Sequence, residues 1–166
     1  ANLQLKSGHP EQITAFIRRL ELPQSLLQPA LALFMKQVPP VTKKLGDLSL
    51  VGRGSYRMAD HHAAFVGQLQ SAPGELKVDL RYAGNELRGK VASGNLHPKL
   101  LFEHKYMPEL LHFEADGHLL LSQGGLPNGQ IQLKIHNATV DHRPYRDIQI
   151  DLSHANGLAD LKLDSR

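Results

Sequence analysis

The sequence predicts a mainly β protein, a curved antiparallel β-sheet meander with one or two short covering helices. Apolar and polar residues alternate over most of the chain, as in 48–58, 76–82, 131–135 and 148–152. Because successive side chains of a strand point to opposite faces, this alternation predicts a sheet with one apolar and one polar face. Turn-forming pairs separate the alternating segments, and few other residues are available to cover the apolar face.

The elements after residue 45 are predicted to be strands joined by short connections, which favours a meander. Prolines fall between the periodic segments, and turn signals lie at Ala72-Pro73-Gly74, Gly84-Asn85, Asn128-Gly129, His142-Arg143-Pro144 and Asn156-Gly157. We expect strands at 47–58, 62–70, 75–82, 86–93, 111–122, 129–140, 145–154 and 158–164.

Two segments indicate helices. The apolar residues of 23–38 recur at helical spacing; Pro23 suits a first turn, and Pro39-Pro40 would end the helix. We expect this helix to cover part of the sheet, and a shorter one at 98–106. Residues 13–22 fit both a helix and a strand, and periodicity does not decide so short a run; we favour the strand.

An internal repeat is visible between 76–93 and 148–165, which align without gaps. Asp79, Leu80, Ala83, Lys90 and Ser93 recur as Asp151, Leu152, Ala155, Lys162 and Ser165. We therefore divide the chain into a strand-plus-helix segment at 1–44, a first β repeat unit at 45–106 and a second at 107–166. Repeated units that stack on their neighbours form elongated proteins. The start at Ala1 and a strand pattern up to the last residues lead us to expect a piece of a longer protein.

Composition excludes several kinds of site. The chain has no cysteine, so it has no disulfide and no thiolate metal site. Its formal charge is +3, with basic and acidic residues interspersed, which argues against a nucleic-acid partner. Tryptophan is absent, which disfavours a stacking platform for bases or sugars. No apolar run is long enough to span a bilayer.

The sequence contains no recognisable catalytic or metal-binding motif. The ten histidines include His61-His62, whose side chains would point to opposite faces of a strand, and no HExxH spacing occurs. We expect solvated histidines and no metal site. There is no GxSxG motif and no cysteine nucleophile, so we expect no enzyme activity and no cofactor.

Glycines recur inside the predicted strands, mostly in the apolar register: Gly52, Gly54, Gly67, Gly89 and Gly117. They mark either β-bulges or a sharply curved sheet, since glycine removes side-chain volume and permits bending.

Segments of the chain resemble the TamB family of translocation and assembly proteins, within the wider AsmA-like group. The resemblance lies in YRDIQIDLSHANGLADLKLDS (145–165), in MPELLHFEADGHLLLS (107–122) and in LGDLSLVGRGSY (45–56). It covers about 45–166 well and 1–44 loosely. The histidine- and arginine-rich polar face departs from the family pattern.

The resemblance implies a U-shaped, taco-like β-sheet with an apolar interior. It also implies a periplasmic protein of Gram-negative bacteria whose parent chain is anchored in the inner membrane by a helix not present here. Members act in outer-membrane biogenesis. They are implicated in moving phospholipid between the two membranes and in assembling outer-membrane barrels with a TamA-like β-barrel partner.

The candidate site is an apolar stripe that would line a groove for phospholipid acyl chains. Its residues are Leu48, Leu50, Phe65, Leu69, Leu76, Val78, Leu80, Phe113, Leu119, Leu121, Ile131, Leu133, Ile135, Ile148, Ile150 and Leu152. Alternatively, these side chains pack on one another and on the 23–38 helix as an ordinary core.

Two further functions stay open. The sheet edges or the groove would template strands of a client barrel by β-augmentation, or the chain would be a structural β-solenoid spacer or adhesin segment. The expected neighbours are phospholipid, the barrel partner and the rest of its own repeat array. A piece that exposes its groove or edge is expected to self-associate.

Overall fold

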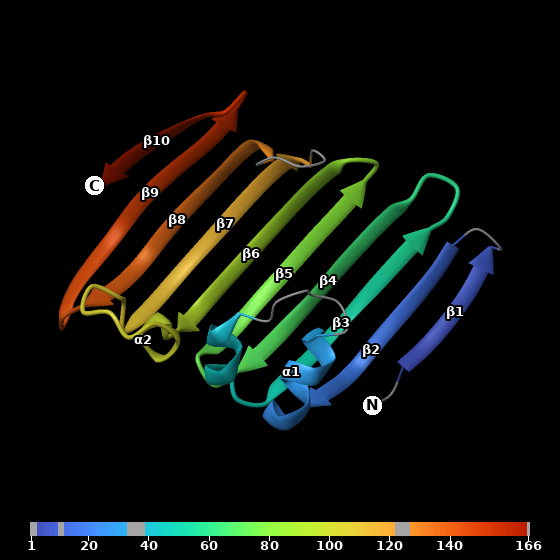
Figure 1. The fold of residues 1–166 in the computed structure, drawn as a ribbon. Coiled ribbons are helices and arrows are strands. Elements are labelled where there is room, and N and C mark those ends of the chain that lie inside the picture. Colours follow the sequence, from blue (N-terminus) through green and yellow to red (C-terminus); the bar gives the residue numbers. More distant parts are fainter. Residues whose placement is uncertain (1–2, 10–11, 33–38, 122–126, 166) are drawn as a thin grey trace.

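The computed structural model describes residues 3–9, 12–32, 39–121 and 127–165. Ten strands form a single antiparallel sheet in which each strand lies beside its neighbours in sequence, so the expected meander is confirmed. The sheet is open and curved (Figure 1). The strands are β1 (Leu3–His9), β2 (Gln12–Leu22), β3 (Leu48–Arg57), β4 (His62–Ser71), β5 (Gly74–Ala83), β6 (Glu86–Leu96), β7 (Leu110–Leu120), β8 (Asn128–Val140), β9 (Arg143–Ala155) and β10 (Leu158–Ser165).

The N-terminal part contains two strands, β1 and β2, of which the sequence favoured only the second. β1 was not predicted, because only Leu3 and Leu5 mark its alternation. β2 is a strand, and a β-bulge explains why its pattern was ambiguous. Ile17 pairs with Gly52 and Leu20 pairs with Leu50, so β2 holds two residues opposite Val51 alone. The bulge leaves a three-residue apolar spacing, which also occurs in helices.

The helices lie at one end of the sheet, near the turns (Figure 1). α1 spans Gln24–Ala32, and residues 33–38 of the predicted helix lie outside the described residues. The backbone N–H of Gln24 donates a hydrogen bond to Asp47 Oδ1 at 2.8 Å, which satisfies a free amide of the first turn. α1 packs beside the 3₁₀ helix η1 (Pro40–Lys44), and its Leu27 is 2% exposed.

The second predicted helix is much shorter than expected. α2 comprises only Pro98–Leu101, and Phe102 is already extended, with φ −123° and ψ 116°. The backbone N–H of Lys99 donates to the carbonyl of Pro108 at 3.0 Å. This bond satisfies a free first-turn amide of α2 and ties α2 to the segment before β7. The helix ends at Leu101, and 103–106 do not continue it.

The turns agree with the sequence signals in most places, with two corrections. The β8–β9 turn is Asp141-His142, one residue earlier than predicted, and Arg143 and Pro144 already pair within β9. Asn128 and Gly129 are not a turn but the first residues of β8, where they pair with Leu120 and Leu119. Pro144 is tolerated because it lies next to the strand's beginning, where proline costs least.

The two segments of the sequence repeat form hairpins of the same register. Val78 pairs with Val91 across β5 and β6, and Ile150 pairs with Leu163 across β9 and β10. Asp79 likewise pairs with Lys90 as Asp151 does with Lys162. The division of the chain into two repeat units stays a prediction, because the sheet runs without interruption through both.

Candidate functional site: the apolar face of the sheet

Cross-strand pairing places the predicted stripe on one side of the sheet, called the apolar face from here on. Residues directly opposite in paired strands share a face. The row through the middle of the sheet therefore runs, strand by strand, through Ile17, Gly52, Gly67, Val78, Val91, Ala115, Leu133, Ile150 and Leu163.

All predicted stripe residues except Leu121 lie within strands and on the apolar face. Rows on both sides of the middle row contain Leu48, Leu50, Phe65, Leu69, Leu76, Leu80, Phe113, Leu119, Ile131, Ile135, Ile148 and Leu152. Leu121 follows the end of β7; its backbone N–H donates to the carbonyl of Asn85 at 2.8 Å.

Among the described residues, no element forms a second layer packed on the apolar face. None of the stripe residues is buried; most are partly exposed, and Leu161 and Leu163 of β10 are 63% and 64% exposed. Among the described residues, the buried hydrophobic side chains are Leu27 and Ala138. The chain exposes 11904 Å², whereas a compact monomer of its mass is expected to expose about 8,200 Å². The alternative of an ordinary closed core therefore does not describe this arrangement.

On this face, glycines let neighbouring side chains lie close to the backbone. Gly52 and Gly67 lie directly opposite each other, and so do Gly89 and Gly117. The ring of Phe65 fills the space above the first pair: its Cζ lies 2.6 Å from the position of a Cβ at residue 67 and 2.9 Å from one at residue 52. These glycines lie in regularly paired strands, so they are not bulge residues.

Sequence reasoning missed part of the face. Ile17, Leu20 and Leu22 continue it across β2, and Val91 and Leu163 continue it across β6 and β10. The β2 residues were obscured by the bulge. Val91 and Leu163 stand in the alternation of their own strands, and that signal was sufficient to find them.

The opposite, polar face carries a row in which acidic and basic side chains mostly alternate. One row passes through Asp79, Lys90, Asp116, Gln132, Asp151 and Lys162. Lys90 Nζ lies 3.2 Å from Asp116 Oδ2, and both side chains are mostly exposed. Exposed pairs of this kind contribute only about 0–1 kcal/mol each. Their effect is to keep the polar face hydrated.

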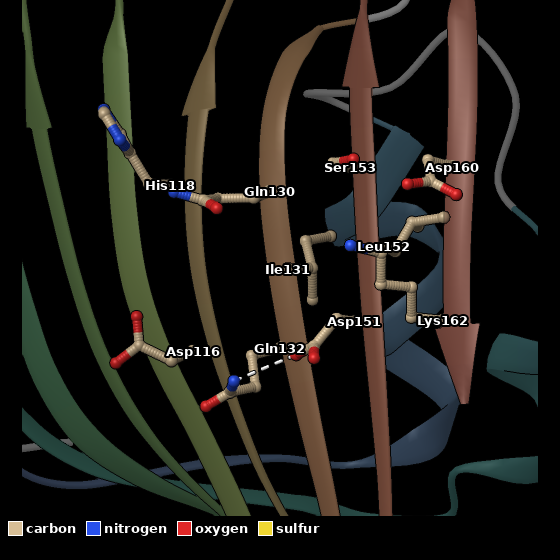
Figure 2. Close-up of a pocket in the computed structure, with 10 residues that line it drawn as sticks. All are labelled: Asp116, His118, Gln130, Ile131, Gln132, Asp151, Leu152, Ser153, Asp160 and Lys162. Atoms are coloured by element: carbon tan, nitrogen blue, oxygen red, sulfur yellow. Dashed lines mark hydrogen bonds between the residues drawn. The ribbon is translucent and has the colours of Figure 1, made fainter. Parts of the chain in front are cut away.

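A hollow of about 480 Å³ lies on the polar face over β7 to β10. Figure 2 shows Gln132 and Asp151 pointing toward one another, with Gln132 Nε2 donating to Asp151 Oδ1 at 2.9 Å. Gln149 Nε2 donates to the other oxygen at 3.0 Å. The two amides hold the pKa of the Asp151 carboxyl below its ordinary range. Both carboxylate oxygens of Asp151 thus already accept hydrogen bonds from the protein.

The histidines form pairs but no larger ligand group. The rings of His112 and His136 lie 4.9 Å apart between centroids, and His142 Nδ1 lies 3.4 Å from Glu109 Oε2. In the part of the chain that the structure describes, no three His, Asp or Glu side chains gather as metal ligands would.

The chain matches no known family profile, and no curated protein or solved structure matches it significantly. None of the helices among the described residues has the length and apolar character needed to cross a membrane.

Proposed function

We propose that the apolar face binds the acyl chains of phospholipids and conducts them along the sheet. The observation that carries this proposal is the apolar face, which no described element covers and which continues from strand to strand across the sheet. Moving a ~16-carbon chain from water into an apolar environment gains a transfer free energy of roughly 12 kcal/mol, at ~0.8 kcal/mol per methylene. A chain lying on an open face gains part of this and can slide, since each step exchanges one apolar contact for another.

The chemistry of the face favours hydrocarbon over peptide as its ligand. Between β2 and β9 every strand is hydrogen-bonded on both sides, so its backbone groups are engaged within the sheet. A peptide laid across this face would bury its own amides and carbonyls without hydrogen-bond partners, at a cost of several kcal/mol per group. A methylene chain has no such groups.

The wider setting of the proposal follows the resemblance to the TamB family. In that setting the chain is part of a longer periplasmic protein, anchored in the inner membrane and acting with a TamA-like barrel. Neighbouring repeat units would extend the same apolar face toward each membrane. The role is one of transport, and it needs neither catalysis nor a cofactor.

The test is native mass spectrometry of the chain purified from bacterial cells, together with organic extraction and lipid analysis. We expect nearly stoichiometric phospholipid, lost in Val78→Arg and in Ile150→Arg, because each places a charge in the middle row. The matched control is Val66→Arg. Val66 lies on the polar face, opposite Arg53 and Asp79, and is 47% exposed. Lipid retained by both apolar-face variants would contradict the proposal.

A second function, templating of client strands, is favoured by the edge strand β10. Every residue of β10 is exposed, and within the described residues it pairs with β9 alone. The two-residue Asn156-Gly157 turn directs the backbone groups of Leu158 and Asp160 toward β9, so those of Ala159 and Leu161 point outward. Ala159→Pro would remove an outward amide without breaking the bonds to β9, and it takes no large apolar side chain from the apolar face.

The two functions are separated by Ala159→Pro and Val78→Arg. Strand templating requires that Ala159→Pro abolish binding of an added β-peptide while Val78→Arg leaves it intact. Lipid conduction requires the reverse effect on bound phospholipid. A chain that binds neither ligand would be a structural spacer.

A further inference from the structure

The apolar face contains a small hollow, called the Gly117 pocket from here on. It measures about 200 Å³. Its floor is formed by Gly89 and Gly117, which pair across β6 and β7, and its walls by Leu80, Leu87, Leu119 and Ile131.

The Gly117 pocket exists because one pair of glycines is left partly uncovered. At the other pair, the Phe65 ring fills the space above Gly52 and Gly67. At Gly89 a Cβ would meet Leu80 Cδ2, so this half of the floor is covered by a neighbouring side chain. At Gly117 the nearest atoms are Ile131 Cγ1 at 3.6 Å and the Gln130 carbonyl oxygen at 3.9 Å. The open part of the pocket is therefore over Gly117.

The lining of the pocket has no polar side chain directed into it. Asp116 borders the pocket, but its carboxylate pairs with Lys90 on the opposite face of the sheet. The backbone groups of β6 are hydrogen-bonded to β5 and β7, and those of β7 to β6 and β8. A ligand segment in the pocket must therefore be free of hydrogen-bonding groups.

We propose that the Gly117 pocket is a subsite that receives a segment of a hydrocarbon chain, an inference that rests on the proposed lipid-binding function. Its volume is below the roughly 300–1,000 Å³ of pockets that enclose whole small molecules. The pocket thus holds part of a chain whose remainder lies on the open face. Gly117 is the residue that determines this contact, because any larger side chain there occupies the pocket.

The variant that tests the subsite is Gly117→Leu. The added side chain has space for its Cβ and lies on the apolar face, so the fold is expected to persist. The matched control is Gly94→Leu, since Gly94 is an exposed β6 glycine whose Cβ would meet no atom within 4 Å. Urea unfolding of both variants verifies that the sheet is intact.

Affinity is measured by calorimetric titration with palmitic acid. Gly117→Leu is expected to weaken binding about tenfold, which corresponds to the lost burial of roughly two methylene groups. Gly94→Leu is expected to bind as the unmodified chain does. Unchanged affinity in Gly117→Leu, with binding abolished in Val78→Arg, would overturn the subsite while leaving the lipid-binding function in place. An unmodified chain that binds no palmitic acid would overturn both.

A second measurement needs no variant and locates the bound chain directly. NOEs between the methylene protons of palmitic acid and the amide protons of the otherwise deuterated protein report which residues the bound chain contacts. The strongest NOEs are expected at Ala115 to Leu119. NOEs centred on β3 or β9 instead would place the chain elsewhere on the apolar face and overturn the subsite.

Discussion

The ring of Phe65 lies over Gly67, two residues further along β4, with Cζ 2.6 Å from the position that a Cβ of residue 67 would occupy. The same ring extends over Gly52 of β3, which pairs with Gly67. Aromatic side chains laid over strand glycines restore packing that glycine alone cannot supply. This contact joins β3 and β4 on a face that none of the described helices or strands covers.

Gly67→Ala is expected to destabilise the protein by about 1–3 kcal/mol, the usual range for overpacking. The new methyl would meet Phe65 Cζ and also the Val51 carbonyl oxygen at 2.7 Å, which is backbone and cannot rotate away. Urea unfolding measures the change. Gly117→Ala is the control and should stabilise by about 0.5–1 kcal/mol, because alanine restricts the unfolded chain and fits here. Equal effects at the two sites would contradict this account.

Two substitutions in the β8–β9 turn are expected to stabilise the protein. Asp141 and His142 have φ values of 50° and 61°, a left-handed conformation that favours Asn-Gly, as at Asn156-Gly157 with 52° and 81°. The double change Asp141→Asn with His142→Gly should raise the free energy of unfolding by about 0.5–1.5 kcal/mol. Thermal and urea unfolding test this. A loss of stability would mean that the contact of His142 with Glu109 outweighs the backbone strain.

The pKa of Asp151 should be lower than that of a free aspartate, because Gln132 and Gln149 donate to its carboxylate. A depressed native pKa contributes stability above the unfolded-state pKa, and this contribution is lost as the pH falls through the native pKa. Gln132→Ala should therefore raise the pKa, and should destabilise more at about pH 7 than at about pH 2.

NMR titration of the Asp151 carboxyl carbon measures this pKa. Gln130→Ala is the control, since Gln130 lies on the same face but pairs with Ser153. An unchanged pKa in Gln132→Ala would show that the hydrogen bond does not persist in solution.

Leu27→Ala is expected to detach α1 without unfolding the sheet. Leu27 is 2% exposed, whereas its neighbour Leu26 is 55% exposed. Removing a buried leucine side chain typically costs about 2–5 kcal/mol. Hydrogen exchange should accelerate at the amide of Leu27, which donates to Pro23, while amides of β4 to β8 stay protected. Leu26→Ala should leave both unchanged.

The strands after residue 45 were predictable because their signal is local. Alternation defines a strand and its faces, and pairs such as Asn156-Gly157 define its ends. Where a local rule is broken, the prediction was ambiguous or failed for an identifiable reason. β2 was favoured as a strand and is one, although the bulge beside Ile17 and Leu20 gave it a helical spacing as well. β1 was missed because it has too few apolar residues to show a period. α2 ends at Leu101, where Phe102 takes an extended conformation, and no local signal in the sequence marked this end.

By itself the sequence determined that this protein is a meander of strands with one apolar and one polar face, because period-two alternation and turn chemistry act between near neighbours. Only the tertiary structure decided that the helices lie at one end, that no described element forms a second layer on the apolar face, and that Phe65 closes one glycine pair while Gly117 stays open. These features depend on register and on contacts between residues far apart in the chain, which composition and periodicity do not encode.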